Sequence, residues 1–342
     1  MSISTGKRCN LYRIYAVYFF FPCPNGQIYG VYIRNWPTLR IRITLVLIPF
    51  SEKYTEPANP TYYIFVLCKL YMTTMTTSTR VTHNFYVISD PQIGHDRQEV
   101  RAAKKTADVL ALDDKDGVII IPGDLTHYGL GSMDPFTKYL CMCFCIRKAR
   151  NESLGDKDEL RELDREHVAP LSKASKDVLM CVGNHDSLTQ WWTGHNPAYG
   201  YVKDRFGGLV YEREIFGNGP VGNDEDGDSI MVYSLSEWPK KKTVDWLAAK
   251  LVRHFKPFVL FFHYNLEGPF SDWWKPEEKE YLYEVGIRPH KDRLAFIAEG
   301  HHHSSYVKEW KGITVVNGGG DNAIRVSVHV SAGAVSTDAK LL

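Results

Sequence analysis

The sequence predicts an α/β (α+β) fold in which two mixed β-sheets pack as a sandwich with helices on both outer faces. Five uninterrupted apolar runs are typical of strands that are buried on both faces. Stretches with apolar residues at helical spacing separate several of these runs, which indicates strands joined by helices. Short β-rich runs divided by turn residues come last and indicate hairpins. Helix-connected strands followed by hairpins fit two packed sheets with helices outside.

The expected elements can be placed along the chain in order. Strands are expected at residues 85–88, 118–121, 178–182, 258–262 and 294–298, with closing strands at 306–307, 314–316 and 324–328. Helices are expected at residues 98–112, 134–150, 156–166 and 243–255. In the first helix, apolar spacing predicts that the face toward the sheet is made of Val100, Ala103, Ala107 and Leu110. In the last helix, the same spacing predicts an inward face of Val244, Leu247, Leu251 and Phe255.

Segments with metal-binding side chains follow the five apolar runs. They are Asp90-Pro91-Gln92, Gly123-Asp124, Gly183-Asn184-His185-Asp186, His263 and Gly300-His301-His302-His303. Because open α/β folds bind ligands at the carboxyl ends of their strands, these segments are expected to meet. Carboxylate and amide oxygens with imidazole nitrogens suit Mn²⁺, Fe or Zn²⁺, and one carboxylate can bridge two cations about 3.5–4 Å apart. Asp124 is the natural bridge.

Each of these residues also has a simpler interpretation. His263 after an apolar strand is, taken alone, more often a core or surface histidine than a ligand, and His301 to His303 alone suit a polar turn. Asp90 suits the start of a turn, and Asn184 suits a helix cap. Five such segments in one order favour a joint metal site over five separate coincidences.

In this order the segments resemble the calcineurin-like metallophosphoesterase family, whose pattern is Asp-x-His, Gly-Asp, Gly-Asn-His-Asp or Gly-Asn-His-Glu, a single His, and Gly-His-x-His. The resemblance runs from about residue 84 to residue 330, and Gly-Asn-His-Asp is its most specific part. It implies a first metal held by Asp90, Gln92, Asp124 and His303. It implies a second metal held by Asp124, Asn184, His263 and His301. His185 resembles the catalytic histidine of the family, a proton donor that Asp186 would steer.

The chain departs from the family pattern at Gln92, where the family usually has a histidine ligand. Some branches of the family carry glutamine there, which implies an intact site with a harder amide oxygen. We therefore expect two divalent metal ions, Mn²⁺ or Fe/Zn²⁺ with Mg²⁺ also compatible, and a shift toward Mn²⁺ or Mg²⁺ over Zn²⁺. His95 is the alternative ligand in place of Gln92.

The resemblance implies a dinuclear-metal-dependent phosphohydrolase in which a metal-bridging hydroxide attacks phosphorus and His185 protonates the leaving group as general acid. The expected substrates are phosphomonoesters or phosphoproteins. One alternative is a hydrolase of nucleotide diphosphates or cyclic phosphodiesters. A second is a non-catalytic metal-binding scaffold, which the presence of His185 and Asp186 disfavours. Aromatic residues at 191–192 and 270–274 follow ligand strands, where they suit either a stacking surface for a base or lids that pack on each other.

Charge and cysteine content limit the partners and the compartment. Lys and Arg number 41 against 40 Asp and Glu, a formal charge of +1, so the chain has no electrostatic footprint for duplex nucleic acid. The expected partners are a phosphorylated small molecule, a nucleotide or a phosphoprotein. Seven cysteines without a Cys-x-x-Cys pair indicate neither a disulfide framework nor a zinc knuckle, and they favour a reducing, cytoplasmic location.

Residues 1–80 do not resemble the family and are interpreted as an atypical, poorly ordered N-terminal extension, with the phosphoesterase domain at 81–342. A charged Lys7-Arg8 flank and an apolar run at 14–21 resemble a secretory signal, but no cleavage-site pattern follows, so secretion is the lesser alternative. The apolar runs at 41–50 and 62–70 are too short to span a bilayer. No site motif lies before Asp90, which predicts that the extension is dispensable.

Overall fold

The computed structural model describes residues 42–46, 65–69, 81–127, 158–188, 196–216, 229–331 and 334–342. The chain divides into two units, Met1–Ser78 and Thr79–Leu342. In the first unit, β1 (Arg42–Val46) and β2 (Phe65–Lys69) pair antiparallel as a two-stranded sheet. The second unit holds every candidate site residue. The helix expected at 134–150 and the aromatic pair expected at 191–192 lie outside the described residues.

One sheet of the second unit has five strands. Their order across the sheet is β13 (Ala334–Leu341), β12 (Ile324–Ser331), β3 (Val81–Val87), β4 (Val118–Pro122) and β5 (Asp177–Cys181). The three strands β3, β4 and β5 run parallel, while β12 pairs antiparallel with both of its neighbours. The carboxyl ends of β3, β4 and β5 therefore meet at one edge of the sheet.

The other sheet has six strands. Their order is β10 (Ser305–Trp310), β11 (Ile313–Gly318), β9 (Leu294–Glu299), β8 (Phe258–Phe261), β7 (Ile230–Leu235) and β6 (Val210–Ile215). The inner strands β7, β8, β9 and β11 are parallel, and β6 and β10 close the two edges antiparallel. Both sheets are mixed, as the sequence predicts. The strands β6, β7 and β13 were not among the predicted elements.

Three apolar layers hold this unit together. The middle layer lies between the sheets, where Phe85, Ile120 and Phe261 are fully buried. Neighbouring residues on the same strands, such as Tyr86 and Ile119, point to the opposite face and pack under helices. A third layer covers the outer face of the six-stranded sheet. The predicted sandwich with helices on both outer faces is confirmed.

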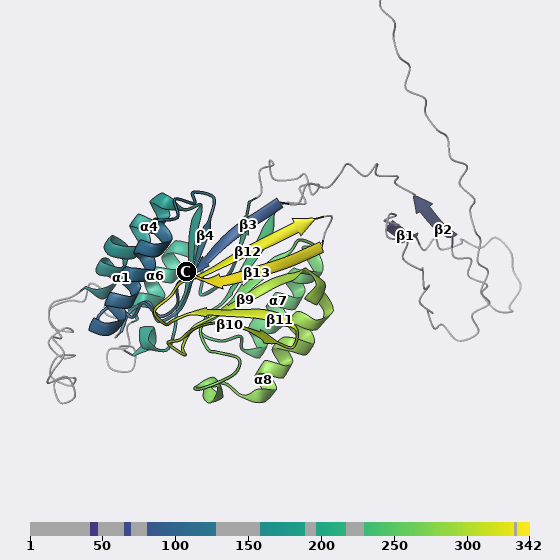
Figure 1. Cartoon of the computed structure of the whole chain (residues 1–342). Helices are drawn as coiled ribbons and strands as arrows, with labels where there is room; N and C mark the ends of the chain where they lie inside the picture. Colours follow the sequence, from purple (N-terminus) through teal and green to yellow (C-terminus); the bar gives the residue numbers. More distant parts are fainter. Residues whose placement is uncertain are drawn as a thin grey trace, which may run out of the picture. The chain divides into compact units, whose positions relative to one another are not determined.

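The helices divide between the two outer faces (Figure 1). Over the five-stranded sheet lie α1 (Asp96–Leu110), α3 (Glu159–Leu163), which continues through a π-helical turn (Asp164–Val168) into α4 (Ala169–Ala174), and α6 (Pro197–Phe206). Over the six-stranded sheet lie α7 (Lys241–Arg253), α8 (Pro276–Tyr281) and the turns Leu282–Ile287 and Arg288–Arg293. Short 3₁₀ turns form at His185–Ser187 and Ser271–Trp273. Within the described ranges, no helix is long and apolar enough to cross a membrane.

The face that α1 turns inward differs from the predicted one at three of its four residues, and only the half-buried Leu110 packs against the apolar layer as predicted. Val100 is 72% exposed, and Ala103 and Ala107 also face outward. The buried face consists of Gln98, Ala102, Lys105, Thr106 and Val109. The prediction was wrong because it ranked positions by apolarity, whereas Lys105 and Gln98 are buried to make polar contacts. Lys105 Nζ donates hydrogen bonds to the carbonyl oxygens of Ser89 at 2.8 Å and Gly318 at 2.7 Å.

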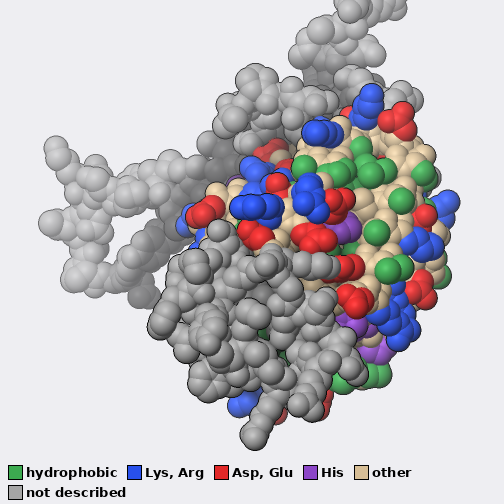
Figure 2. Space-filling view, turned by 90° about the vertical axis from the view of Figure 1, so that its left-hand side faces the viewer, with side chains coloured by type: hydrophobic (Ala, Val, Ile, Leu, Met, Phe, Trp, Pro, Cys, Tyr) green, Lys and Arg blue, Asp and Glu red, His purple; other side chains and the backbone are tan. Residues whose placement is uncertain are grey.

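In α7, the structure buries three of the four predicted inward residues, Val244, Leu247 and Leu251. Phe255 was predicted wrongly and is 79% exposed. The helix ends at Arg253, so helical spacing no longer fixes where Phe255 points. On the face shown in Figure 2, Lys and Arg lie interspersed with Asp and Glu instead of being gathered by sign.

Candidate metal centre

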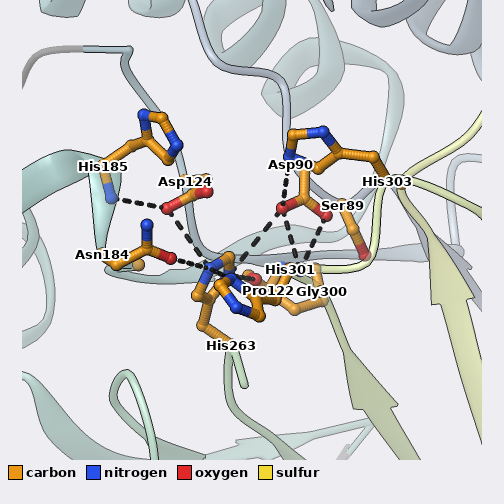
Figure 3. A network of polar contacts seen from close by, with 12 residues as sticks. Ser89, Asp90, Pro122, Asp124, Asn184, His185, His263, Gly300, His301 and His303 are labelled. Carbon is orange, nitrogen blue, oxygen red and sulfur yellow. Dashed lines mark hydrogen bonds and ion pairs between the residues drawn. The ribbon is translucent and has the colours of Figure 1, made fainter. Parts of the chain in front are cut away.

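The seven predicted ligands lie together at the ends of five parallel strands. Asp90 and Gln92 follow β3, Asp124 follows β4, Asn184 follows β5, His263 follows β8, and His301 and His303 follow β9. Figure 3 shows the side chains of these loops turned toward one another, with Asp124 between the two halves of the cluster. The sequence order therefore becomes a spatial cluster because parallel strands deliver their carboxyl ends to the same place.

The first candidate site consists of Asp90, Gln92, Asp124 and His303. Ligand atoms of Asp90, Asp124 and His303 lie within 4.8 Å of one another. The amide nitrogen Nε2 of Gln92 lies 3.0 Å from His303 Nε2 and 3.0 Å from Asp124 Oδ2. A half turn about the terminal bond places its Oε1 there, which is the orientation that a cation requires.

The second candidate site consists of Asp124, Asn184, His263 and His301. Its centre is His263 Nε2, which lies 2.9 Å from Asn184 Oδ1, 3.2 Å from His301 Nδ1 and 3.3 Å from Asp124 Oδ1. Asn184 Oδ1 and Asp124 Oδ1 can only accept hydrogen bonds. The protons of the two imidazole rings are therefore the only ones available among these two oxygens and the two ring nitrogens. Such a donor set fits a divalent cation.

Asp124 belongs to both candidate sites through different oxygens. Its Oδ1 faces His263 and its Oδ2 faces Gln92. The backbone N–H of His185 donates to Oδ1 at 2.9 Å, which fixes the direction of the carboxylate. Asp124 is buried. This is the geometry that a bridging carboxylate between two cations needs.

Five of the seven candidate ligands have left-handed backbone conformations. They are Asp90 (φ 52°), Gln92 (φ 40°), Asp124 (φ 48°), His301 (φ 70°) and His303 (φ 49°). Such conformations cost non-glycine residues of order 1–3 kcal/mol each and gather at functional sites. Ten non-glycine residues in the described ranges have positive φ, and half of them are these ligands. Backbone strain is therefore concentrated where the side chains must converge.

Glycines in the motifs permit the close approach of the strand ends. A Cβ atom on Gly183 would lie 2.2 Å from Asp124 Oδ1, and one on Gly300 would lie 2.5 Å from the carbonyl oxygen of Pro122. Both positions would collide with atoms that cannot move without displacing a ligand. The Gly-Asn-His-Asp and Gly-His-x-His patterns thus have a steric reason for their first residue.

Asp186 has a different role from the expected one. Its buried carboxylate accepts hydrogen bonds from the N–H groups of Leu125 (3.1 Å), Thr126 (2.9 Å) and Gly183 (2.8 Å) and from the Thr126 hydroxyl (2.8 Å). We expected it to steer His185, and that expectation was wrong because the carboxylate points at the loop after β4. Asp186 ties this loop, which carries the bridging carboxylate, to the loop after β5. It is a positioning residue.

The ring of His185 is held by the backbone of His127. His185 Nδ1 lies 3.0 Å from the carbonyl oxygen of His127, and the two rings stack with centroids 5.0 Å apart. A carbonyl oxygen only accepts, so Nδ1 carries a proton and Nε2 is left as the nitrogen that gains or gives one. His95 packs its ring against His127, and it is Gln92 that lies in the first site.

The electrostatic environment places Asp124 and His301 in the protonation states that a metal needs, and it shifts the pKa of His263 and Asp90 the opposite way. Burial raises the pKa of Asp124, but His263 and His185 outweigh it and leave the pKa well below its usual range. Burial, reinforced by His263, lowers the pKa of His301 to about 3, so its ring is neutral at neutral pH. Burial lowers the pKa of His263, yet Asp124 offsets this and raises it to about 9. Burial raises the pKa of Asp90. A bound cation would replace the proton of His263 and favour ionised Asp90.

Sequence reasoning missed three residues that support the ligands. Gln98 lies 3.0 Å from His303 Nδ1 through its amide, Lys105 anchors the backbone just before Asp90, and buried Glu299 accepts from Leu266 N at 2.9 Å. The signal for Gln98 and Lys105 was their position, since both fall on one face of α1. The signal for Glu299 was that a charged residue ends an otherwise apolar strand. Partners of this kind fix the orientation of metal-binding side chains.

In this two-sheet sandwich, two sets of candidate ligands share one aspartate at the ends of the parallel strands, an arrangement that could hold two cations side by side. A family model described as calcineurin-like phosphoesterase matches residues 83–305, which is more than half of the chain. The chain belongs to the calcineurin-like phosphoesterase family. A sequence search of curated proteins finds no match.

Solved structures to which this chain is similar include a putative 5'-nucleotidase from Staphylococcus aureus, with 14% identity and a TM-score of 0.43 over 77% of this chain and 54% of that one. This chain spans about half the length of that protein. They also include phosphopantetheinyl hydrolase from Mycobacterium tuberculosis, with 14% identity, a TM-score of 0.37, and 68% and 88% coverage. Vacuolar protein sorting 29 from Cryptosporidium parvum has 12% identity, a TM-score of 0.29, and 76% and 98% coverage. At such identities and TM-scores the likeness says nothing about the substrate.

Proposed function

We propose that the chain is a two-metal phosphohydrolase that acts on phosphomonoesters, either small molecules or phosphoproteins, with His185 as general acid. The observation that carries the proposal is the orientation of the Asp124 carboxylate: its Oδ1 faces one set of candidate ligands and its Oδ2 faces the other. A shared carboxylate of this kind sets two cations side by side, which suits the displacement of an alcohol from phosphorus.

In this proposal the first cation would be held by Asp90, Gln92, Asp124 and His303, and the second by Asp124, Asn184, His263 and His301. When bound, the two cations supply charge neutralisation for the phosphate oxygens and a water of lowered pKa as nucleophile. His185 holds a proton on Nε2 and gives it to the departing oxygen, because His127 fixes its other nitrogen. Asp186 keeps the loop of the bridging carboxylate in place.

The ligand types bear on which metals bind. The first site has three oxygen-bearing side chains and one imidazole, since Gln92 stands where the family usually has a histidine. Oxygen-rich sites favour Mn²⁺ or Mg²⁺ over softer metals, so we propose Mn²⁺ with Fe or Zn²⁺ as competitors. We also propose a reducing, cytoplasmic location, for which the odd number of cysteines and the buried free thiol of Cys181 are the support.

A substrate panel tests the proposal. The full chain is assayed with Mn²⁺ on a phosphomonoester, a cyclic phosphodiester and a nucleotide diphosphate, beside Asp124→Asn and the exposed control Asp338→Asn. We expect turnover of the monoester by the parent chain and by Asp338→Asn, and loss of most activity in Asp124→Asn. Preference for the diester or the diphosphate would support the alternative hydrolase instead. Metal binding without turnover of any substrate would support the scaffold.

A further inference from the structure

Two aromatic rings border the second candidate site. Trp273 and Phe270 are 51% and 56% exposed, and their ring centroids lie 4.7 Å and 5.8 Å from that of His301 in edge-to-face contact. We call this pair the aromatic platform. It belongs to the segment that follows β8, directly after the ligand His263. A group bound at the second site would therefore have two ring faces or edges within reach.

The segment that carries the platform is fixed by its own hydrogen bonds. Asn265 Nδ2 donates to the carbonyl oxygens of Glu267 at 2.9 Å and Pro269 at 2.8 Å. The indole N–H of Trp274 donates to the carbonyl oxygen of Asn265 at 3.0 Å. The backbone N–H of Leu266 donates to the buried carboxylate of Glu299, the last residue of β9, which His301 and His303 follow. The platform is thus preorganised, which lowers the entropic cost of binding a ring.

The exposure of the platform is not a failure of the segment to bury its aromatic residues. The same segment packs Tyr264 and Trp274 into the apolar layer outside the six-stranded sheet, where they are 5% and 1% exposed. Phe270 is turned outward with a left-handed backbone, φ 63°. Among the exposed large apolar side chains of the described ranges, three are aromatic, and two of those form the platform; Phe255 is the third. Lids packed on each other would hide these two rings.

We propose that the aromatic platform binds a planar ring of the substrate, so that the enzyme prefers phosphate esters that carry an aromatic ring close to the phosphate. The inference deepens the proposed function and rests on it, because the phosphate must occupy the candidate metal sites beside His301. Stacking on tryptophan and phenylalanine recognises any planar ring. The ring can come from a nucleobase or from an aryl ester such as phosphotyrosine, and the two sources are separable by experiment.

Matched substrates measure the contribution of the ring. The pairs are adenosine monophosphate with ribose 5-phosphate, and phosphotyrosine with phosphoserine. Trp273→Leu and Phe270→Leu keep apolar bulk and remove the rings, while Phe255→Leu does the same at an exposed ring elsewhere. We expect KM for the ring-bearing member of one pair to rise roughly tenfold in the platform variants, with kcat and the ring-free member little changed. The pair that responds identifies the source of the ring.

Direct binding gives a readout that does not depend on turnover. Adenosine and tyrosine, which lack phosphate, are titrated against the full chain and against Trp273→Leu by saturation-transfer nuclear magnetic resonance. If adenosine or tyrosine contacts the parent chain and not Trp273→Leu, the result supports the aromatic platform. This holds even if no phosphate ester is hydrolysed; in that case only the proposed function is refuted. Turnover without ring preference, together with equal binding by parent and variant, would overturn the platform and leave the proposed function intact.

Discussion

Replacement of His185 by glutamine separates proton donation from metal binding. The backbone N–H of His185, not its ring, donates to Asp124 Oδ1, and the variant keeps that group. The ring itself reaches the carbonyl oxygen of His127 and none of the candidate ligand side chains. We therefore expect His185→Gln to bind the same two metals as the parent chain and to lose the general acid only.

The magnitude follows from what a general acid contributes. Loss of proton donation lowers turnover by about 10²–10⁴-fold, which corresponds to roughly 2.7–5.4 kcal/mol of barrier. The loss should be large for an alkyl phosphate, whose alkoxide leaves only when protonated. It should fall to about tenfold or less for p-nitrophenyl phosphate, whose leaving group is stable as an anion. Turnover of both substrates is measured at saturating Mn²⁺, together with the metal content of each protein.

Asp186→Asn provides the contrast. An amide at this position cannot accept all the hydrogen bonds that the carboxylate receives from Leu125, Thr126 and Gly183, so the loop after β4 should loosen. This variant should lose stability and affect both substrates alike. The reasoning is refuted if His185→Gln shows the same loss for both leaving groups, or if it loses its metals.

Three further predictions concern other parts of the chain. Gln92→His should raise the preference for Zn²⁺ or Fe relative to Mn²⁺ in competitive metal binding, and an unchanged preference would show that Gln92 is not a ligand. Tyr211→Phe should lower the stability by about 2 kcal/mol, several degrees of melting temperature, because its buried hydroxyl bonds both the N–H (3.1 Å) and the carbonyl (2.7 Å) of Met180 across the two sheets. Tyr233→Phe removes a buried hydroxyl that has no hydrogen-bond partner among the described residues, so it should cost nothing, and equal losses would contradict the argument. A chain that begins at Met75 should keep its turnover and melting temperature, and a drop of several degrees would mean that the preceding residues stabilise the fold.

The candidate ligands were predictable from the sequence because the fold turns sequence order into position. The strands that precede the candidate ligands are visible in the sequence as apolar runs, and the residues after them lie at the shared edge of the parallel strands. This rule places Asp90, Asp124 and His263, whereas their assignment as ligands needed all five segments together and the family resemblance. The glycines beside them were part of the motif, but only the structure shows what they avoid, as the 2.2 Å approach of a Gly183 Cβ to Asp124 Oδ1 illustrates.

Apolar periodicity failed where polar side chains serve the site. It turned α1 the wrong way, since Lys105 and Gln98 are buried to reach the backbone before Asp90 and the ring of His303. It also passed over β6, an edge strand whose sequence Val-Tyr-Glu-Arg-Glu-Ile is half polar, with Arg213 and Glu214 exposed. A method that ranks residues by hydrophobicity cannot predict that Lys105 is buried, because its amine is stabilised there by hydrogen bonds to two carbonyl oxygens.

Adjacency in sequence was also a poor guide to contact. Asp186 follows His185, and the expectation that one steers the other came from that proximity. In the 3₁₀ turn His185–Ser187 the two side chains point to different surroundings, the carboxylate to the loop after β4 and the ring to His127. Spacing alone does not encode the direction of side chains in so short a turn.

Metal stoichiometry tests the central claim most directly. The full chain and Asp124→Asn are equilibrated with Mn²⁺, freed of excess metal, and analysed for manganese per chain, with Asp338→Asn as control. The shared carboxylate predicts two ions per parent chain and per control chain, and a loss from both sites in Asp124→Asn, because each cation loses the same charged ligand. One ion or none in a parent chain that hydrolyses phosphate esters would contradict the two-metal account.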